Sequence, residues 1–214
     1  MSVRVTVITI GGQPAISLGC SDGAFPREQQ LTQPKPLTQQ LLLMAFAAMG
    51  YATLFFVNNW VFAALEFTAG VNWVYLPAGL RLLLVLMFGL AGALGISVAS
   101  ATISIFVYFS PDPSIGIVAG LISGFMPYLV QQLMQRFAKL DRNLLNINAT
   151  SLLQLALLYA VATSFGHQIW YAYRGVTEHF WSTVWPMFVG DLLGTVLVLY
   201  AAHAVMKLMR RRPA

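Results

Sequence analysis

The chain of 214 residues is far more apolar, and far poorer in charge, than a soluble domain. Hydrophobic residues make up 58% of it and charged residues 9%, whereas an average soluble domain is roughly 25% charged. Because so few charges cannot cover a soluble surface, the composition excludes a soluble enzyme, a disordered chain and a nucleic-acid binder. It predicts a polytopic helical membrane protein whose first partner is the lipid bilayer.

Residues 1–37 differ from the rest and are expected to form a flexible cytoplasmic leader. A short β-branched run from Val3 to Ile10 ends at Gly11-Gly12, and Gln, Pro, Ser and Thr then dominate. This stretch cannot bury enough apolar area to fold alone, and no clean signal-peptide cleavage site follows it. An extension upstream of a misplaced start codon is the alternative interpretation.

Residues 38–206 contain six apolar stretches near the roughly 20 residues that a membrane-spanning helix needs. Leu90-Ala91-Gly92 joins the second to the third in a tight helical hairpin, and Pro111-Asp112-Pro113 separates the third from the fourth. The predicted fold class is therefore an all-α membrane bundle of six transmembrane helices, followed by a basic tail at 207–214. The predicted spans are 38–57, 73–89, 91–109, 114–134, 150–172 and 183–206.

The formal net charge of +5 is unevenly distributed among the predicted loops. The loop before the fifth span and the segment after the sixth are rich in Lys and Arg, whereas the 173–182 loop has only Arg174. Basic loops stay in the cytoplasm, so both termini are expected there, in a multi-pass protein of a bacterial inner membrane. The 58–72 connection then lies outside, with its Val61–Leu65 patch on the membrane surface or folded back as a lid.

Arg81 and Asp191 are the only charged residues well inside predicted spans. An unpaired charge at mid-bilayer costs about 2.5–3.5 kcal/mol, so such residues usually face the bundle interior and pair. Both lie about eight residues, or roughly 12 Å, into spans of the same direction, and this matching depth predicts an ion pair. Three interpretations stay open: a pair that only fixes helix packing, a ligand-binding site in the outer half of the bundle, and no pair, with the Arg81 side chain extended to the membrane surface.

Tyr159, Thr163 and His167 share one face of the fifth span and extend this candidate ligand site. Their alternative role is ordinary hydrogen bonding between helices. His203 lies at the opposite end from His167, so we expect no metal or haem, and no cofactor. The sequence has no HExxH, GxSxG or Walker motif, and we therefore expect no enzyme.

Small residues at four-residue spacing predict close helix contacts within the bundle. Pro186 is expected at the start of the sixth span, where its missing N–H is tolerated. The predicted packing positions are Gly116, Gly120, Gly124, Gly190, Gly194, Ala48 and Ala52.

The run from Val71 to Leu80, with Trp73, Pro77 and Gly79, and the later Gly190-Asp191-Leu192-Leu193-Gly194 resemble two motifs of the MASE1 integral membrane sensor domain. The resemblance implies a sensory membrane domain for an unidentified small-molecule ligand. Sensors of this type usually continue into a kinase or cyclase domain, which is not present after residue 206 here. The resemblance therefore implies a separate output partner, a protein in the membrane or cytoplasm.

A second resemblance supplies the alternative function. Six helices with an outer first loop, the Ala48-x-x-x-Ala52 step and later Gly/Asp-rich helices look like substrate-binding subunits of energy-coupling-factor vitamin transporters. In that family the alanine step contacts the coupling subunit, and substrate lies under the first loop. A third class stays open as well, a purely structural membrane protein whose polar pairs bind nothing.

Overall fold

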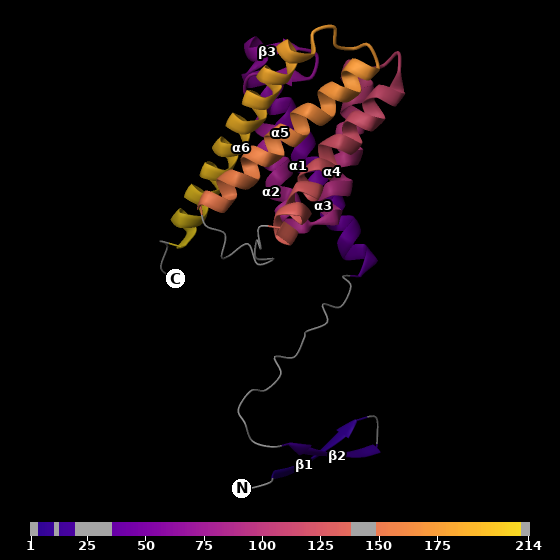
Figure 1. The fold of residues 1–214 in the computed structure, drawn as a ribbon, viewed down its shortest axis with the longest axis vertical. Helices are drawn as coiled ribbons and strands as arrows, with labels where there is room; N and C mark the ends of the chain where they lie inside the picture. Colours follow the sequence, from indigo (N-terminus) through magenta and orange to yellow (C-terminus); the bar gives the residue numbers. More distant parts are fainter. Residues whose placement is uncertain (1–3, 11–12, 20–35, 138–148, 211–214) are drawn as a thin grey trace. The chain divides into compact units, whose positions relative to one another are not determined.

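The structure, a computed structural model, describes residues 4–10, 13–19, 36–137 and 149–210. The chain divides into two units, Met1–Pro34 and Lys35–Ala214. In the first, β1 (Arg4–Ile10) pairs antiparallel with β2 (Gln13–Gly19), with Arg4 opposite Gly19 and Ile10 opposite Gln13 (Figure 1). The predicted leader therefore contains a β-hairpin, while Cys20 and the rest of 20–35 lie outside the described residues.

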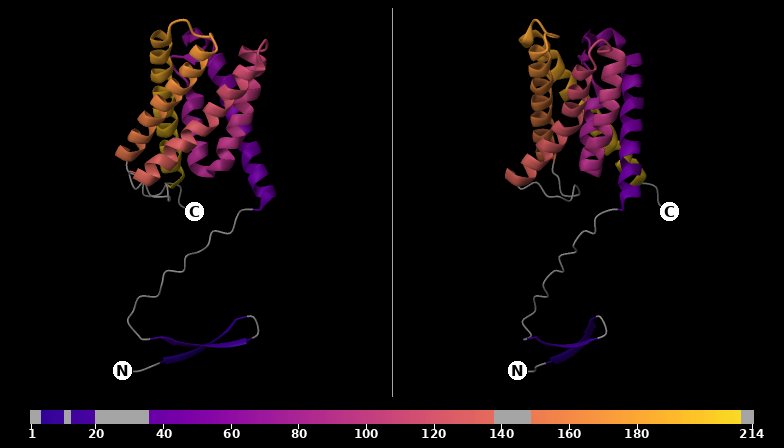
Figure 2. Two further views of the ribbon diagram at one scale, coloured as in Figure 1. Left: turned by 45° about the vertical axis from the view of Figure 1, so that its right-hand side comes forward. Right: turned by 90° about the vertical axis from the view of Figure 1, so that its right-hand side faces the viewer.

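The second unit is the predicted all-α helical bundle, and the chain reverses direction at each connection between its helices (Figure 2). Five helices are long and apolar enough to cross a membrane, so the protein is a multi-pass membrane protein in contact with lipid. The helices are α1 (Leu37–Val61), α2 (Leu76–Phe88), α3 (Leu90–Ile103), α4 (Pro113–Phe137), α5 (Ala149–Tyr173) and α6 (Phe180–Arg210).

The prediction of six full-length spans is wrong for the second, because α2 has only 13 residues. It would extend about 20 Å, less than the roughly 30 Å hydrocarbon core of a bilayer. Residues 73–75, predicted as its beginning, are not helical and follow the short strand β4 (Val71–Asn72). The Tyr75 amide donates to the Gly190 carbonyl oxygen at 3.2 Å, so α2 begins beside the interior of α6 rather than at its end.

Gly190 and Gly194 allow this non-helical segment to lie directly against α6. A Cβ at Gly190 would lie 1.9 Å from the Asn72 carbonyl oxygen, and one at Gly194 would lie 1.9 Å from that of Tyr75. A Cβ at Gly79 of α2 would approach the Gly194 carbonyl oxygen to 2.6 Å. Both glycines therefore lie against an extended backbone segment.

The glycine stripe of α4 packs against α3 and its continuation. A Cβ at Gly120 would lie 2.4 Å from the Ala101 amide nitrogen, and one at Gly124 would lie 2.2 Å from the Ser97 hydroxyl oxygen. Gly116 makes the same kind of approach to Ile105, which belongs to the π-helix η2 (Ser104–Tyr108) that continues α3.

The close-packed positions of α1 differ from the predicted alanine step. Ala48 and Ala52 are half-buried, whereas Ala47 is fully buried, and a Cβ at Gly95 would lie 3.1 Å from its Cβ. The buried face of α1 consists of Ala47, Tyr51, Phe55 and Asn58. Only 17% of the apolar stretch of α1 is buried, against 44% for α3, α4 and α5, so α1 is the most peripheral of the five long helices.

Two other local predictions are corrected. The hairpin between α2 and α3 turns at Gly89 alone, with φ at 59°, and Leu90-Ala91-Gly92 belongs to α3. This left-handed conformation favours glycine, so one residue is enough to reverse the chain. Pro186 lies inside α6, six residues after Phe180.

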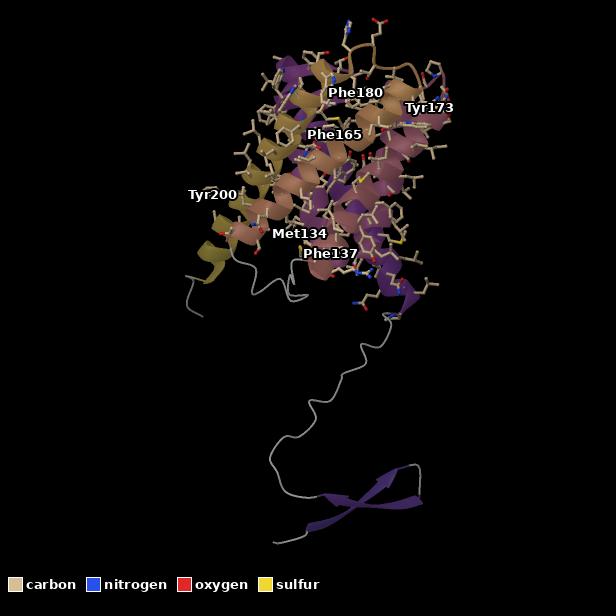
Figure 3. The ribbon with its side chains drawn as sticks, viewed as in Figure 1. Met134, Phe137, Phe165, Tyr173, Phe180 and Tyr200 are labelled. Carbon is tan, nitrogen blue, oxygen red and sulfur yellow. The ribbon has the colours of Figure 1, made fainter. Side chains whose placement is uncertain are left out.

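The connection between α1 and α2 is structured. It contains a 3-10 turn, Ala63–Leu65, and the strand β3 (Glu66–Thr68), which pairs antiparallel with β4. Val61 and Leu65 of the expected membrane-surface patch are exposed. Other exposed apolar side chains surround the bundle: Phe137, Tyr173 and Tyr200 are 74–80% exposed and extend outward, where lipid covers apolar surface (Figure 3).

We expect Gly194→Ala to destabilise the bundle, because its Cβ would collide with main-chain atoms of Tyr75 that cannot rotate away. Overpacking of this kind costs about 1–3 kcal/mol. Gly50→Ala is the matched control, since its Cβ would meet only a Leu80 methyl group at 4.0 Å and would improve helix propensity. Thermal unfolding in detergent measures both, and equal melting temperatures would contradict the close approach.

Candidate functional site

The predicted ion pair between Arg81 and Asp191 is present inside the bundle. Arg81 Nη2 lies 3.4 Å from Asp191 Oδ1, and the two side chains are 2% and 1% exposed. This single contact is long, and neither Arg81 Nε nor Asp191 Oδ2 has a hydrogen-bond partner among the described residues. The guanidinium also lies over the Tyr75 ring, 5.2 Å from its centroid, and 6.0 Å from that of Tyr51.

The two charges meet for a reason that differs from the predicted one. Arg81 lies five residues after the start of α2, whereas Asp191 lies eleven residues after the start of α6. Their depths match because α2 begins beside Gly190, the residue before Asp191. The extended segment ahead of α2 therefore sets the depth of Arg81.

A small cavity lies beside Arg81. Its volume is about 30 Å³, room for about two water molecules. The lining comes from all six helices of the bundle, from η2, from the β3–β4 turn at Gly70 and from the residue that precedes α2. It consists of Tyr51, Phe55, Gly70, Tyr75, Arg81, Ser100, Ile103, Ser104, Tyr108, Ser123, His167, Tyr171 and Met187.

Hydroxyl groups form a network across this cavity. The hydroxyl oxygens of Tyr51 and Tyr75 lie 3.0 Å apart, and Tyr51 also donates to the Ser100 hydroxyl at 3.4 Å. The Tyr108 hydroxyl accepts from Asn59 Nδ2 at 3.2 Å, which leaves its own proton available. The cavity is therefore rich in hydrogen-bond donors.

His167 is held at the cavity wall through both ring nitrogens. Nδ1 lies 2.9 Å from the Thr163 carbonyl oxygen, and Nε2 lies 3.2 Å from both the Ser123 hydroxyl and the Ala119 carbonyl oxygen. With the proton on Nδ1, the neutral ring donates to the Thr163 carbonyl and Nε2 accepts from the Ser123 hydroxyl; with the proton on Nε2, the ring donates to the Ala119 carbonyl. The ring also packs against that of Tyr171, with 5.9 Å between centroids.

The structure divides the predicted site residues into two groups. Arg81 and His167 line the cavity, whereas Asp191, Tyr159 and Thr163 are buried but do not line it. Tyr159 packs in an apolar cluster that includes Ala78 and Leu82. Thr163 contributes its main-chain carbonyl to His167, and its own hydroxyl has no partner among the described residues.

Asn58 supports the site from α1, and the sequence did not predict this role. It is 0% exposed on α1, and its Oδ1 accepts from the Leu76 amide at 2.9 Å, which caps the first turn of α2. The predicted first span ends at residue 57, so Asn58 is expected in a loop. The detectable signal is its helical spacing from Tyr51 and Phe55, which continues the buried face of α1.

The π-helix η2 is a second feature that the sequence did not predict. Such turns are rare and are frequently found at functional sites. Both ends of η2, Ser104 and Tyr108, line the cavity. The side chain of Tyr108 also packs edge-on against Phe55 of α1, with 6.2 Å between ring centroids.

A second ion pair connects the loop before α4 to the end of α5. Arg174 contacts Asp112, and it donates to the Ser114 hydroxyl at 2.6 Å. The hydrogen bond from Ser114 and the nearby Arg174 guanidinium lower the pKa of the exposed Asp112 carboxyl. These contacts hold the two helices together at the end of the bundle where β3 and β4 lie (Figure 1).

The chain matches no model of a known protein family, no curated protein and no solved structure.

We expect Arg81→Ala and Asp191→Ala each to destabilise the protein by about 3–5 kcal/mol, because each leaves the other charge buried and unpaired. The double variant should lose less than the sum of the two, since neither charge remains. Unfolding free energies in detergent measure this coupling. Losses that add within about 0.5 kcal/mol would mean that the pair contributes no interaction energy.

Proposed function

We propose that this membrane protein is a sensory domain that binds a small ligand in the cavity beside Arg81 and signals through a separate protein partner in the membrane or cytoplasm. The observation that carries the proposal is a cavity with several polar groups and a buried charge at its wall, inside the membrane-spanning bundle. Ionisable residues within membrane bundles are rare and usually mark functional sites.

The origin of the lining residues supports a sensory role. Tyr51, Ser100, Ser123 and Tyr171 come from α1, α3, α4 and α5, and Gly70 comes from the β3–β4 turn. A ligand that contacts several elements can favour one arrangement of them over another by its difference in affinity. The peripheral α1 carries a broad lipid-facing surface on which a membrane partner could detect such a change.

The contact between the two sequence motifs also supports the resemblance to the MASE1 sensors. The Pro77/Gly79 motif and the Gly190–Gly194 motif lie about 110 residues apart in sequence. They meet where a Cβ at Gly79 would approach Gly194. A spatial cluster of motif residues is what a shared architecture would require.

The full proposal includes six membrane passes and two cytoplasmic termini in a bacterial inner membrane. In this proposal, α2 and the extended residues before it together form the second of the six passes. The connections 62–75, 109–112 and 174–179 share one end of the bundle and contain Arg174 as their only Lys or Arg (Figure 2). Arg136 lies at the opposite end, near the end of α4, and the sequence that follows the described part of α4 contains Lys139 and Arg142.

A binding role fits this cavity better than catalysis. The Ser123–His167 contact has the distance of a nucleophile and its general base. However, the His167 ring is oriented by a main-chain carbonyl, and a cavity of about 30 Å³ has no room for an acyl substrate. The same volume argues against a vitamin-uptake subunit, since pockets for drug-sized ligands measure about 300–1,000 Å³.

The orientation can be tested with cysteine labelling in spheroplasts. Cys20, the single native cysteine, should resist an impermeant maleimide until the membrane is permeabilised. In a Cys20→Ser background, cysteines at the exposed positions Ser110 and Val176 should react without permeabilisation. Labelling of Cys20 alone in intact spheroplasts would reverse the proposed orientation.

The sensory role can be tested by filling the cavity. Ser100→Val adds methyl groups to the wall, and we expect it to reproduce the transcript profile of a gene deletion while the protein level stays normal. Thr102→Val is the matched control, because Thr102 lies on the same helix but is exposed. A Ser100→Val profile identical to wild type would contradict a ligand-dependent signal and favour a purely structural protein.

A further inference from the structure

We infer that the ligand of this cavity is a small monovalent anion of halide size. The inference rests on the proposed ligand-binding role and specifies the chemistry of the ligand. It follows from the size of the cavity, the character of its lining and the local electrostatic field.

Size excludes most organic ligands. The cavity volume of about 30 Å³ accommodates about two water molecules, so a ligand of more than a few heavy atoms does not fit inside it. A halide ion has dimensions close to those of water. Gluconate, a common counter-ion in binding experiments, is too large to enter.

The lining favours an anion over a cation. Among the described residues that line the cavity, none is Asp or Glu, the ligands that hard cations prefer. The polar groups present include four tyrosine hydroxyls, three serine hydroxyls and the Arg81 guanidinium. Hydroxyl protons can rotate toward an anion, and hydrogen bonds to a charged acceptor are stronger than those between neutral groups.

Arg81 retains donor capacity despite its ion pair. Asp191 contacts one terminal nitrogen at 3.4 Å, and the buried Nε has no partner among the described residues. A guanidinium has five N–H donors, so this one contact leaves most of them unused. Asp191 does not line the cavity, so an anion could approach Arg81 from the cavity side without displacing the carboxylate.

The start of α2 adds a favourable field. Tyr75, the residue that precedes the helix, lines the cavity, so the positive end of the helix dipole lies nearby. The Leu76 amide already bonds to Asn58, and the Ala78 amide to the Tyr75 carbonyl. The helix therefore contributes its dipole rather than a free N–H. Interrupted membrane helices use this arrangement to stabilise anionic groups.

The test is halide-dependent thermal stability of the full chain in detergent. Sodium chloride or sodium bromide replaces sodium gluconate at constant ionic strength, so the sodium concentration does not change. We expect the melting temperature to rise with halide concentration and to saturate, as ligand binding to the folded state requires. A melting temperature that changes with neither halide would overturn the inference.

Two variants locate the effect while Arg81 and Asp191 stay in place. Tyr75→Phe and Ser100→Ala each remove one hydroxyl from the lining, and we expect each to weaken halide binding about tenfold. Tyr173→Phe is the matched control, because its hydroxyl lies on an exposed side chain outside the cavity. Equal halide affinity in all four proteins would place the ion elsewhere and refute this site.

The result is separable from that of the signalling test. If halides have no effect but Ser100→Val still reproduces the deletion profile, the anion is wrong and the sensory role stands. If halides bind through Tyr75 and Ser100 but Ser100→Val leaves the profile unchanged, the anion site stands and the sensory role is wrong.

Discussion

In a bilayer, backbone N–H and C=O groups have no water to bond, so a non-helical segment can lie at depth only where protein satisfies it. The segment that precedes α2 meets this requirement through α6 and α1. Gly190 accepts the Tyr75 amide proton, Asn58 accepts that of Leu76, and the absence of a side chain at Gly194 permits the backbone approach. The short length of α2, the depth of Arg81 and the position of the cavity all depend on this contact.

The electrostatics of the site follow from that geometry. Because α2 begins beside Gly190, Arg81 reaches the depth of Asp191, and a charge that would be costly in lipid gains a partner. The pairing is one long contact rather than a two-bond fork, so the guanidinium is neutralised without being saturated. A buried pair of this kind is weak evidence for stability alone. The remaining N–H donors of the Arg81 guanidinium can bind a ligand in the adjacent cavity. Helix packing alone gives these donors no role.

Close backbone contacts at glycines surround this cavity. Glycines fix α3 to α4 and the segment before α2 to α6, because main-chain atoms in contact cannot adjust as flexible side chains do. The same kind of contact reaches η2, where Gly116 meets Ile105, and α1, where Gly95 meets the Met44 carbonyl oxygen. The rest of α1 is largely exposed to lipid.

Composition and apolar run length, which are properties of the chain alone, determined the class: a helical membrane bundle with its breaks near the observed loops. The cost of a buried charge likewise predicted the Arg81–Asp191 pair, because few partners were available. The sequence could not show that residues 73–75 are extended, since apolar residues suit a buried helix and a buried loop equally. Contact with α6 decided this, and it moved α2 inward. The cavity required residues from distant segments, among them Tyr51, Tyr108 and Ser123, to converge, and only helix packing sets those distances.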